Sequence, residues 1–214
     1  MDKLMETTLS ILAGSELTLE IFFVTLFLSL PLGFVEALLR LSDFKPVSRL
    51  TEIYIWVMRG SPLMLQLLFV YFALPLVGIM LDPMPSALIA FTLNYAAYFA
   101  EIFRAGIQSI ERGQYEAART LGMTYMQTMR RIILPQMIHR VLPPVSNETI
   151  NLVKDTSLIY ILAMNDLLRV ARTIVQRDFD MTAFFIAGAF YLFMTAILTW
   201  GFKRLEEHFG KYDE

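Results

Sequence analysis

Three long stretches of the chain carry no charged residue, and they limit the possible fold more than any other feature. Residues 60–81 and 181–202 each run for 22 residues without Asp, Glu, Lys or Arg, and residues 83–100 add 18 more. An α-helix rises about 1.5 Å per residue, so about 20 apolar residues cross the roughly 30 Å hydrocarbon layer of a bilayer. Stretches of this length predict membrane-spanning helices rather than the buried helices of a water-soluble core.

Two further segments are apolar but contain ionisable residues. Residues 17–41 have an uncharged centre bracketed by two glutamates, which can reach the headgroup regions. Residues 141–165 are interrupted by Glu148, Lys154 and Asp155, and ionisable residues at this depth usually face protein or water. We therefore predict an all-α integral membrane protein that forms a single domain over residues 1–214. The five predicted transmembrane helices cover about 17–41, 52–81, 84–107, 141–165 and 181–203.

The remaining composition argues against several kinds of site. The chain has no cysteine, which excludes disulfides and thiolate metal sites, and its two histidines lie in no ligand cluster, so we predict no metal site. It has neither a Gly-x4-Gly-Lys-Ser/Thr loop for nucleotide phosphates nor a Gly-x-Ser-x-Gly nucleophile. The first 16 residues lack the basic and apolar regions of a signal peptide. We expect a non-enzymatic membrane protein that binds no cofactor and no nucleic acid.

Basic residues are distributed unevenly between the two sides of the predicted spans. Positive residues gather on the cytoplasmic side of membrane proteins. Twelve of the 18 Lys and Arg residues fall on one side and four on the other. This asymmetry predicts an amino terminus outside, with residues 1–16 as a short amphipathic helix on the outer surface. It also predicts a cytoplasmic carboxyl terminus and a cytoplasmic loop at residues 113–135.

The loop at 113–135 is polar and basic between two apolar segments. Ala117 and Ala118 favour a helix and leave room for close approach, and Glu116 suits the positive end of a helix dipole. Gly122 permits a sharp turn, so we expect short helices on both sides of it, at about 115–121 and 125–133. Such a rigid hairpin is suited to transmit force from a partner.

Three prolines set the expected boundaries beyond this hairpin. Pro135 is expected to end the second short helix. Pro143 and Pro144 are expected to open the fourth span, because proline is tolerated in a first helical turn.

Arg119, within the hairpin, can pair with acidic groups on a partner.

The same loop fills every fixed position of a known pattern. It reads Glu-Ala-Ala, three residues, Gly, nine residues, Ile, one residue, and then Leu134-Pro135. The pattern resembles the EAA loop of ABC importer permeases. Arg59-Gly60-Ser61-Pro62 with Gln66, residues 94–101, and Lys154-Asp155-Thr156-Ser157-Leu158 resemble further motifs of permeases for polar amino acids, of the histidine/glutamine/arginine/cystine type.

This resemblance implies a type I ABC importer permease fold and a set of partners. In that family the loop contacts a cytoplasmic ABC ATPase dimer, which binds ATP and Mg²⁺, through positions that correspond here to Glu116, Ala117, Ala118, Arg119, Gly122, Leu134 and Pro135. The resemblance also implies a second permease, an extracytoplasmic solute-binding protein, an amino-acid substrate and a bacterial-type cell membrane. The resemblance does not determine whether the two permeases are identical or different, or which amino acid they transport.

Helical spacing selects candidate solute contacts. One helix face carries Asn94, Tyr98 and Glu101, and a face of the fourth span carries Glu148, Asn151 and Asp155. A zwitterionic amino acid needs a cation for its carboxylate and acceptors for its ammonium group. Our candidates are Arg59, Gln66, Asn94, Tyr98, Glu148, Lys154, Asp155 and Ser157. The same residues can instead pair with other spans and only hold the bundle together.

Other classes of membrane protein fit the sequence less well. An ion-coupled secondary transporter or a channel could use Glu148, Lys154 and Asp155 as a proton relay, but such proteins often contain internal repeats, and none is visible. A membrane enzyme would need a clustered metal or nucleophile set. We therefore favour an ATP-driven amino-acid importer, with the ion-coupled transporter or channel as the alternative.

Overall fold

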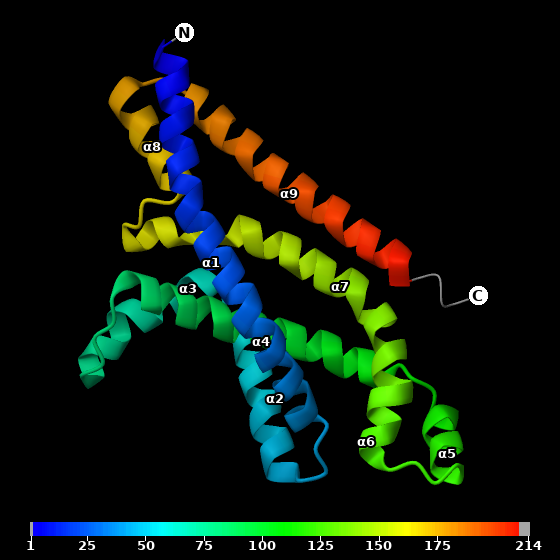
Figure 1. The fold of residues 1–214 in the computed structure, drawn as a ribbon. Helices are drawn as coiled ribbons and strands as arrows, with labels where there is room; N and C mark the ends of the chain where they lie inside the picture. Colours follow the sequence, from blue (N-terminus) through cyan, green and yellow to red (C-terminus); the bar gives the residue numbers. More distant parts are fainter. Residues whose placement is uncertain (1, 210–214) are drawn as a thin grey trace.

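The computed structural model of the protein describes residues 2–209, and this range contains only helices and connecting loops (Figure 1). The α-helices are α1 (Asp2–Arg40), α2 (Lys45–Gly60), α3 (Leu63–Leu68), α4 (Pro83–Gln108), α5 (Arg112–Thr120), α6 (Tyr125–Thr128), α7 (Leu134–Asp155), α8 (Leu167–Asp178) and α9 (Thr182–Phe209). Two π-helical turns, Phe69–Ala73 and Met129–Ile133, and two 3-10 segments, Leu74–Val77 and Thr156–Leu162, join some of them. The predicted all-α fold class is confirmed.

The first helix is longer than expected. Residues 1–16 were predicted to form a separate surface helix before a span at 17–41, but α1 runs without interruption for 39 residues. At about 1.5 Å per residue its length is near 58 Å, well beyond one hydrocarbon layer. Gly14 does not break the helix. It lets α8 pack closely, because a Cβ there would lie 3.1 Å from the backbone of Asp166.

The segment predicted as one span at 52–81 is broken. α2 ends at Gly60, and the chain resumes as α3 at Leu63 after a turn of 105°. The cause is Pro62, which has no backbone N–H and disfavours helix at the residue before it. Ser61 is accordingly extended, with φ −115° and ψ 148°.

The expected roles of the prolines around α7 were wrong. Pro135 does not end a helix but lies in the first turn of α7, directly after the π-helical turn Met129–Ile133. A π-helical turn bonds i to i+5, so it tolerates a missing N–H at the usual position. Pro143 and Pro144 lie inside α7 rather than at its start. The helix ends at Asp155 and continues as a 3-10 segment to Leu162, short of the predicted boundary at 165.

Three described helices, α1, α4 and α9, are long and apolar enough to cross a membrane, and the bent segment from α2 to Val77 gives a fourth if it counts as one span. α7 is not among them, because its many polar residues make it much less apolar on average than α1, α4 and α9. The five-span count therefore stays a prediction.

The core lies where α1 and α7 pack against α4. Phe22, Phe91 and Phe99 are among its largest fully buried side chains. Glycine allows the closest approaches: a Cβ at Gly33 of α1 would lie 2.7 Å from the carbonyl oxygen of Ala96 in α4. Small residues let membrane helices approach closely and gain packing energy. This three-helix core supports the pocket described below.

Candidate functional site

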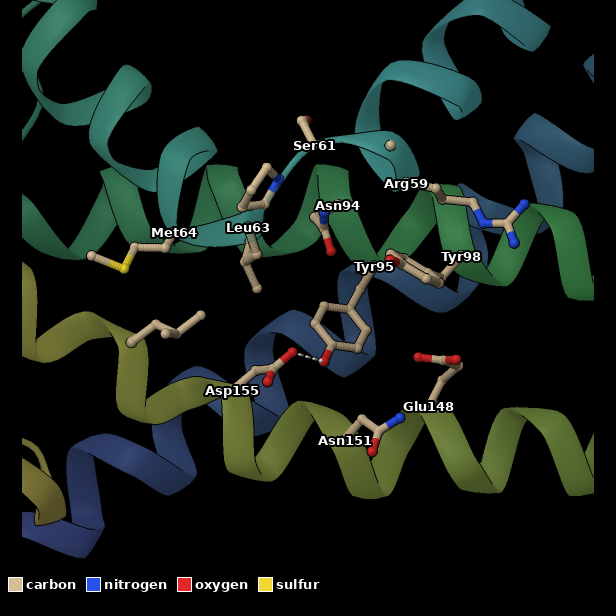
Figure 2. A pocket seen from close by; sticks show the side chains of 13 residues that line it. Arg59, Ser61, Leu63, Met64, Asn94, Tyr95, Tyr98, Glu148, Asn151 and Asp155 are labelled. Atoms are coloured by element: carbon tan, nitrogen blue, oxygen red, sulfur yellow. Dashed lines mark hydrogen bonds between the residues drawn. The ribbon is translucent and has the colours of Figure 1, made fainter.

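A pocket of about 650 Å³ opens where the α2–α3 bend faces α4 and α7 (Figure 2). The bend contributes residues 59–64 to its wall. α4 contributes Asn94, Tyr95 and Tyr98, and the end of α7 with the 3-10 segment contributes Glu148, Asn151, Asp155 and Leu158. Both walls contain a helix interruption, at Pro62 on one side and just after Asp155 on the other. Discontinuous helices also form the solute sites of many secondary transporters.

The pocket separates one cation from two carboxyl groups. The Arg59 guanidinium lies over the ring of Tyr98, 5.4 Å from its centroid, on the side formed by the bend. Glu148 and Asp155 lie on the opposite side, along α7, as Figure 2 shows. The Tyr95 hydroxyl donates to Asp155 Oδ2 at 2.7 Å, which ties α4 to the end of α7. The cavity thus offers positive and negative groups on facing walls.

Five of the eight predicted solute-site residues line this pocket, namely Arg59, Asn94, Tyr98, Glu148 and Asp155. The other three do not. Gln66 lies behind the bend, where its amide contacts Asn94 and the backbone. Lys154 is exposed on another face of α7, and Ser157 is half-buried in the following 3-10 segment.

Tyr95 and Asn151 line the pocket but were not among the predicted site residues. Their signals were present in the sequence. Tyr95 is three residues before Tyr98, on nearly the same helix face, and Asn151 is three residues after Glu148. Tyr95 is 2% exposed, so most of its ring packs in the hydrophobic core, and its hydroxyl end lies at the pocket wall.

A second pocket of about 450 Å³ adjoins the first, because Arg59, Tyr98 and Glu148 line both. Its wall extends along α4 to Ser109 and along α7 to Arg140. The Arg140 guanidinium donates to the Ser109 carbonyl oxygen at that end. The two pockets together extend along α4 and α7 from the bend to Ser109 and Arg140, near the residues that lead into α5.

The predicted helical hairpin is present, and two capping motifs make it rigid. Gly122 has φ +71°, the left-handed conformation that favours glycine, and confirms the predicted break. It ends α5 in a Schellman motif, in which Met123 N donates to the Ala118 carbonyl at 3.0 Å. α6 then opens with a capping box between Thr124 and Gln127, with bonds of 2.9 and 3.3 Å. The two motifs are adjacent, because Met123 of the first directly precedes Thr124 of the second.

The hairpin is anchored on one side and exposed on the other. Ala118 is buried, and a small apolar cluster of Ile110, Met129 and Ile133 joins the hairpin to the ends of α4 and α7. Most of the predicted coupling residues point outward or sit at the base: Glu116, Ala117, Arg119, Gly122 and Pro135 are exposed, and Leu134 is partly buried. Large apolar side chains at the tip are also exposed, namely Leu121, Tyr125 and Met126.

The chain resembles known membrane transport proteins over most of its length. Residues 29–211 match the family described as binding-protein-dependent transport system inner membrane component. The probable amino-acid ABC transporter permease YckA of Bacillus subtilis is 39% identical over 203 residues, which cover 94% of this chain and 90% of that protein. The arginine transport system permease ArtQ of the same species is 38% identical and covers 95% of this chain and 94% of its own length.

Solved structures agree with the sequence comparison. The crystal structure of an amino acid ABC transporter with histidines contains a chain that superposes with a TM-score of 0.89 at 33% identity, covering 96% of this chain and 97% of that one. A chain of the MetNI methionine ABC transporter, at 19% identity and a TM-score of 0.77, shares the fold. The protein therefore belongs to the inner membrane components of binding-protein-dependent transport systems, and it is a permease subunit of an ABC transporter.

Proposed function

We propose that this permease carries an amino acid across the membrane through the pocket between the α2–α3 bend, α4 and α7. The observation that supports the proposal most directly is the facing arrangement of Arg59 with Glu148 and Asp155 around one cavity. The guanidinium suits an α-carboxylate, and the carboxyl groups suit an ammonium group. The facing charges thus complement a zwitterion.

The names of the relatives support an amino acid as the solute. They include permeases for arginine and for glutamate/aspartate, the latter GltK of Escherichia coli at 38% identity. Because these relatives are about equally similar to this chain, similarity does not choose among their solutes.

The hairpin of α5 and α6 is proposed to couple the pocket to a motor. Its exposed apolar tip is suited to a groove on a cytoplasmic ABC ATPase dimer. ATP and Mg²⁺ would bind to that ATPase and not to the permease. Glu116 and Arg119, exposed on α5, can add polar contacts. We further propose a second permease, homologous or identical, and a solute-binding protein on the opposite side.

The fold is compatible with an amino terminus outside and a carboxyl terminus in the cytoplasm. The loop between α1 and α2 and the α5–α6 hairpin lie toward the same end of the molecule, and the start of α1 with α8 lies toward the other (Figure 1). The first group carries much of the basic charge that favours the cytoplasmic side. Membership of the permease family argues against the alternative of an ion-coupled transporter.

The experiment is uptake of radiolabelled amino acids into liposomes that contain the permease, its cognate ATPase and its binding protein. We expect ATP-dependent uptake, a strong loss with Arg59→Gln, and a much smaller effect with Lys154→Gln. Lys154 is a matched control because it is an exposed cation of α7 that does not line the pocket. Uptake that persists without the ATPase and follows an ion gradient would contradict the proposal.

A further inference from the structure

The bend between α2 and α3 deprives one backbone carbonyl of its usual partner. In a continuous helix the carbonyl of Met58 would accept from the N–H of residue 62, but residue 62 is a proline. The preceding carbonyl, of Val57, keeps its partner, since Ser61 N donates to it at 3.1 Å. An unpaired carbonyl away from water costs free energy, so the Met58 carbonyl needs a donor from elsewhere.

Two side-chain amides supply that donor. Gln66 Nε2 donates to the Met58 carbonyl oxygen at 2.8 Å, and Asn94 Nδ2 donates to the same oxygen at 3.0 Å. Gln66 Nε2 also donates to Ser61, at 2.8 Å to its hydroxyl and 3.2 Å to its carbonyl oxygen. The amides contact each other, because Asn94 Nδ2 donates to Gln66 Oε1 at 3.0 Å. One network therefore joins the end of α2, α3 and the middle of α4.

This network occupies the amide nitrogens. Each amide nitrogen carries two hydrogens, and each has at least two acceptors within the protein. Asn94 is only 3% exposed, and Figure 2 shows it beneath the bend, close to Ser61. A solute could use either nitrogen only by breaking the bonds that hold the bend.

We propose that Gln66 and Asn94 are positioning residues, which replace the donor missing at Pro62 and thereby hold the bend at 105°. Holding the bend fixes Arg59 and residues 60–64 along the wall of the pocket. Neither amide nitrogen binds the solute. The effect on solute binding rests on the proposed function, whereas the effect on the bend does not.

The bend angle can be measured directly because the sequence has no cysteine. Spin labels on cysteines at Ile53 of α2 and Phe69 after α3, both exposed, report the distance across the bend by pulsed EPR. Each label lies eight residues from Ser61, which is about 12 Å along a helix at 1.5 Å per residue. The backbones of residues 53 and 69 should therefore lie about 15 Å apart across the 105° bend, and about 24 Å apart in a straight helix.

The test uses the purified complex of the permease with its ATPase. We expect one narrow short distance in the unmodified protein and a broader, longer distribution with Gln66→Met, which keeps the size of the side chain but removes its donors. Adding Pro62→Ala to Gln66→Met restores a backbone N–H at residue 62 and should shift the distribution further toward the straight distance. Gln176→Met on α8, where Gln176 is exposed, is the matched control and should change nothing.

Uptake by the same variants separates positioning from direct contact. We expect Gln66→Met to raise the half-saturating solute concentration at least fivefold in parallel with the broadened distance. If Gln66→Met does not insert, Gln66→Asn, which shortens the side chain by one methylene, gives the same comparison. An unchanged distance with weakened uptake would overturn the proposal in favour of direct solute contact, and no change in either would also overturn it. An altered distance in the Gln66→Met variant, together with no amino-acid uptake by the unmodified complex, would support the positioning role and refute the proposed function.

Discussion

Gly33 should be difficult to replace, because it lies where α1 crosses α4 and a Cβ there would meet backbone atoms. A Cβ at this position would meet the Ala96 carbonyl oxygen at 2.7 Å, the Phe99 Cβ at 2.8 Å and the Ala100 nitrogen at 3.0 Å. Two of these three atoms belong to the backbone and cannot rotate away. Ordinary contact begins at 3.4 Å, so the axes must separate by about 0.7 Å or the helices must tilt.

Two opposing free-energy terms decide whether Gly33→Ala stabilises or destabilises the folded protein. Replacing glycine by alanine inside a helix gains up to about 1 kcal/mol of helix preference. Overpacking a close contact costs about 1–3 kcal/mol, and the backbone atoms at Gly33 place this site toward the upper end. We therefore expect Gly33→Ala to destabilise the folded protein by about 1–2 kcal/mol, and Gly33→Val by more, because its added methyl groups enlarge the clash.

The assay is reversible unfolding of the purified permease in mixed micelles, followed by circular dichroism and tryptophan fluorescence. Gly201→Ala is the matched control: it lies in α9, also within an apolar helix, and a Cβ there meets nothing within 4 Å. We expect this control to be neutral or slightly stabilising. Equal stability of Gly33→Ala and Gly201→Ala would refute the argument that the α1–α4 crossing requires glycine.

Three further predictions concern the hairpin, the pocket and the contact between the start of α1 and the end of α8. Gly122→Ala forces alanine to a φ near +71°, at a cost above about 1 kcal/mol, and should reduce the stimulation of ATP hydrolysis by the loaded binding protein; Gly113→Ala, which meets open space, should not. Glu148→Gln removes a charge-assisted contact worth about 1.5–3 kcal/mol and should raise the half-saturating solute concentration roughly 10- to 100-fold in uptake assays; an unchanged value would place the ammonium group elsewhere. Hydrogen bonds from Arg177 and Lys3 hold the pKa of Asp178, the last residue of α8, at about 2, below its ordinary 3.8. Because a lowered pKa stabilises the fold above the ordinary value, the stability from this contact should be lost as pH falls from about 4 toward 2, and Asp178→Asn should remove that part of the pH dependence.

The sequence predicted the hairpin more accurately than the helices around it. The local signals were complete there, because Gly122 requires a turn and the alanines favour a helix, and both depend only on neighbouring residues. The spacing of Thr124 and Gln127 also matches a capping box, which is a further local signal for the start of α6. The bounds at Pro135 and Pro143 were wrong, because a π-helical turn and packing against α4 keep α7 helical through residues that usually interrupt helices.

The candidate pocket was partly predictable. Helical spacing grouped Asn94 with Tyr98 and Glu148 with Asp155, and the structure brings both pairs to one cavity. Lys154 could not be separated from Asp155 by the sequence, since adjacent residues differ by about 100° around a helix and the facing side depends on how α7 packs. The structure directs Asp155 into the pocket and leaves Lys154 outside its wall.

The apolar stretches by themselves determined that the chain is helical and suited to a membrane, because their length matches a bilayer and their backbone must bond internally. The loop at 113–135 likewise determined the kind of transporter that the chain resembles. Only the tertiary structure decided that residues 52–81 bend instead of crossing straight. The reason is that the bend depends on Pro62 together with donors from Gln66 and Asn94, and Asn94 lies 36 residues away from the carbonyl that it completes.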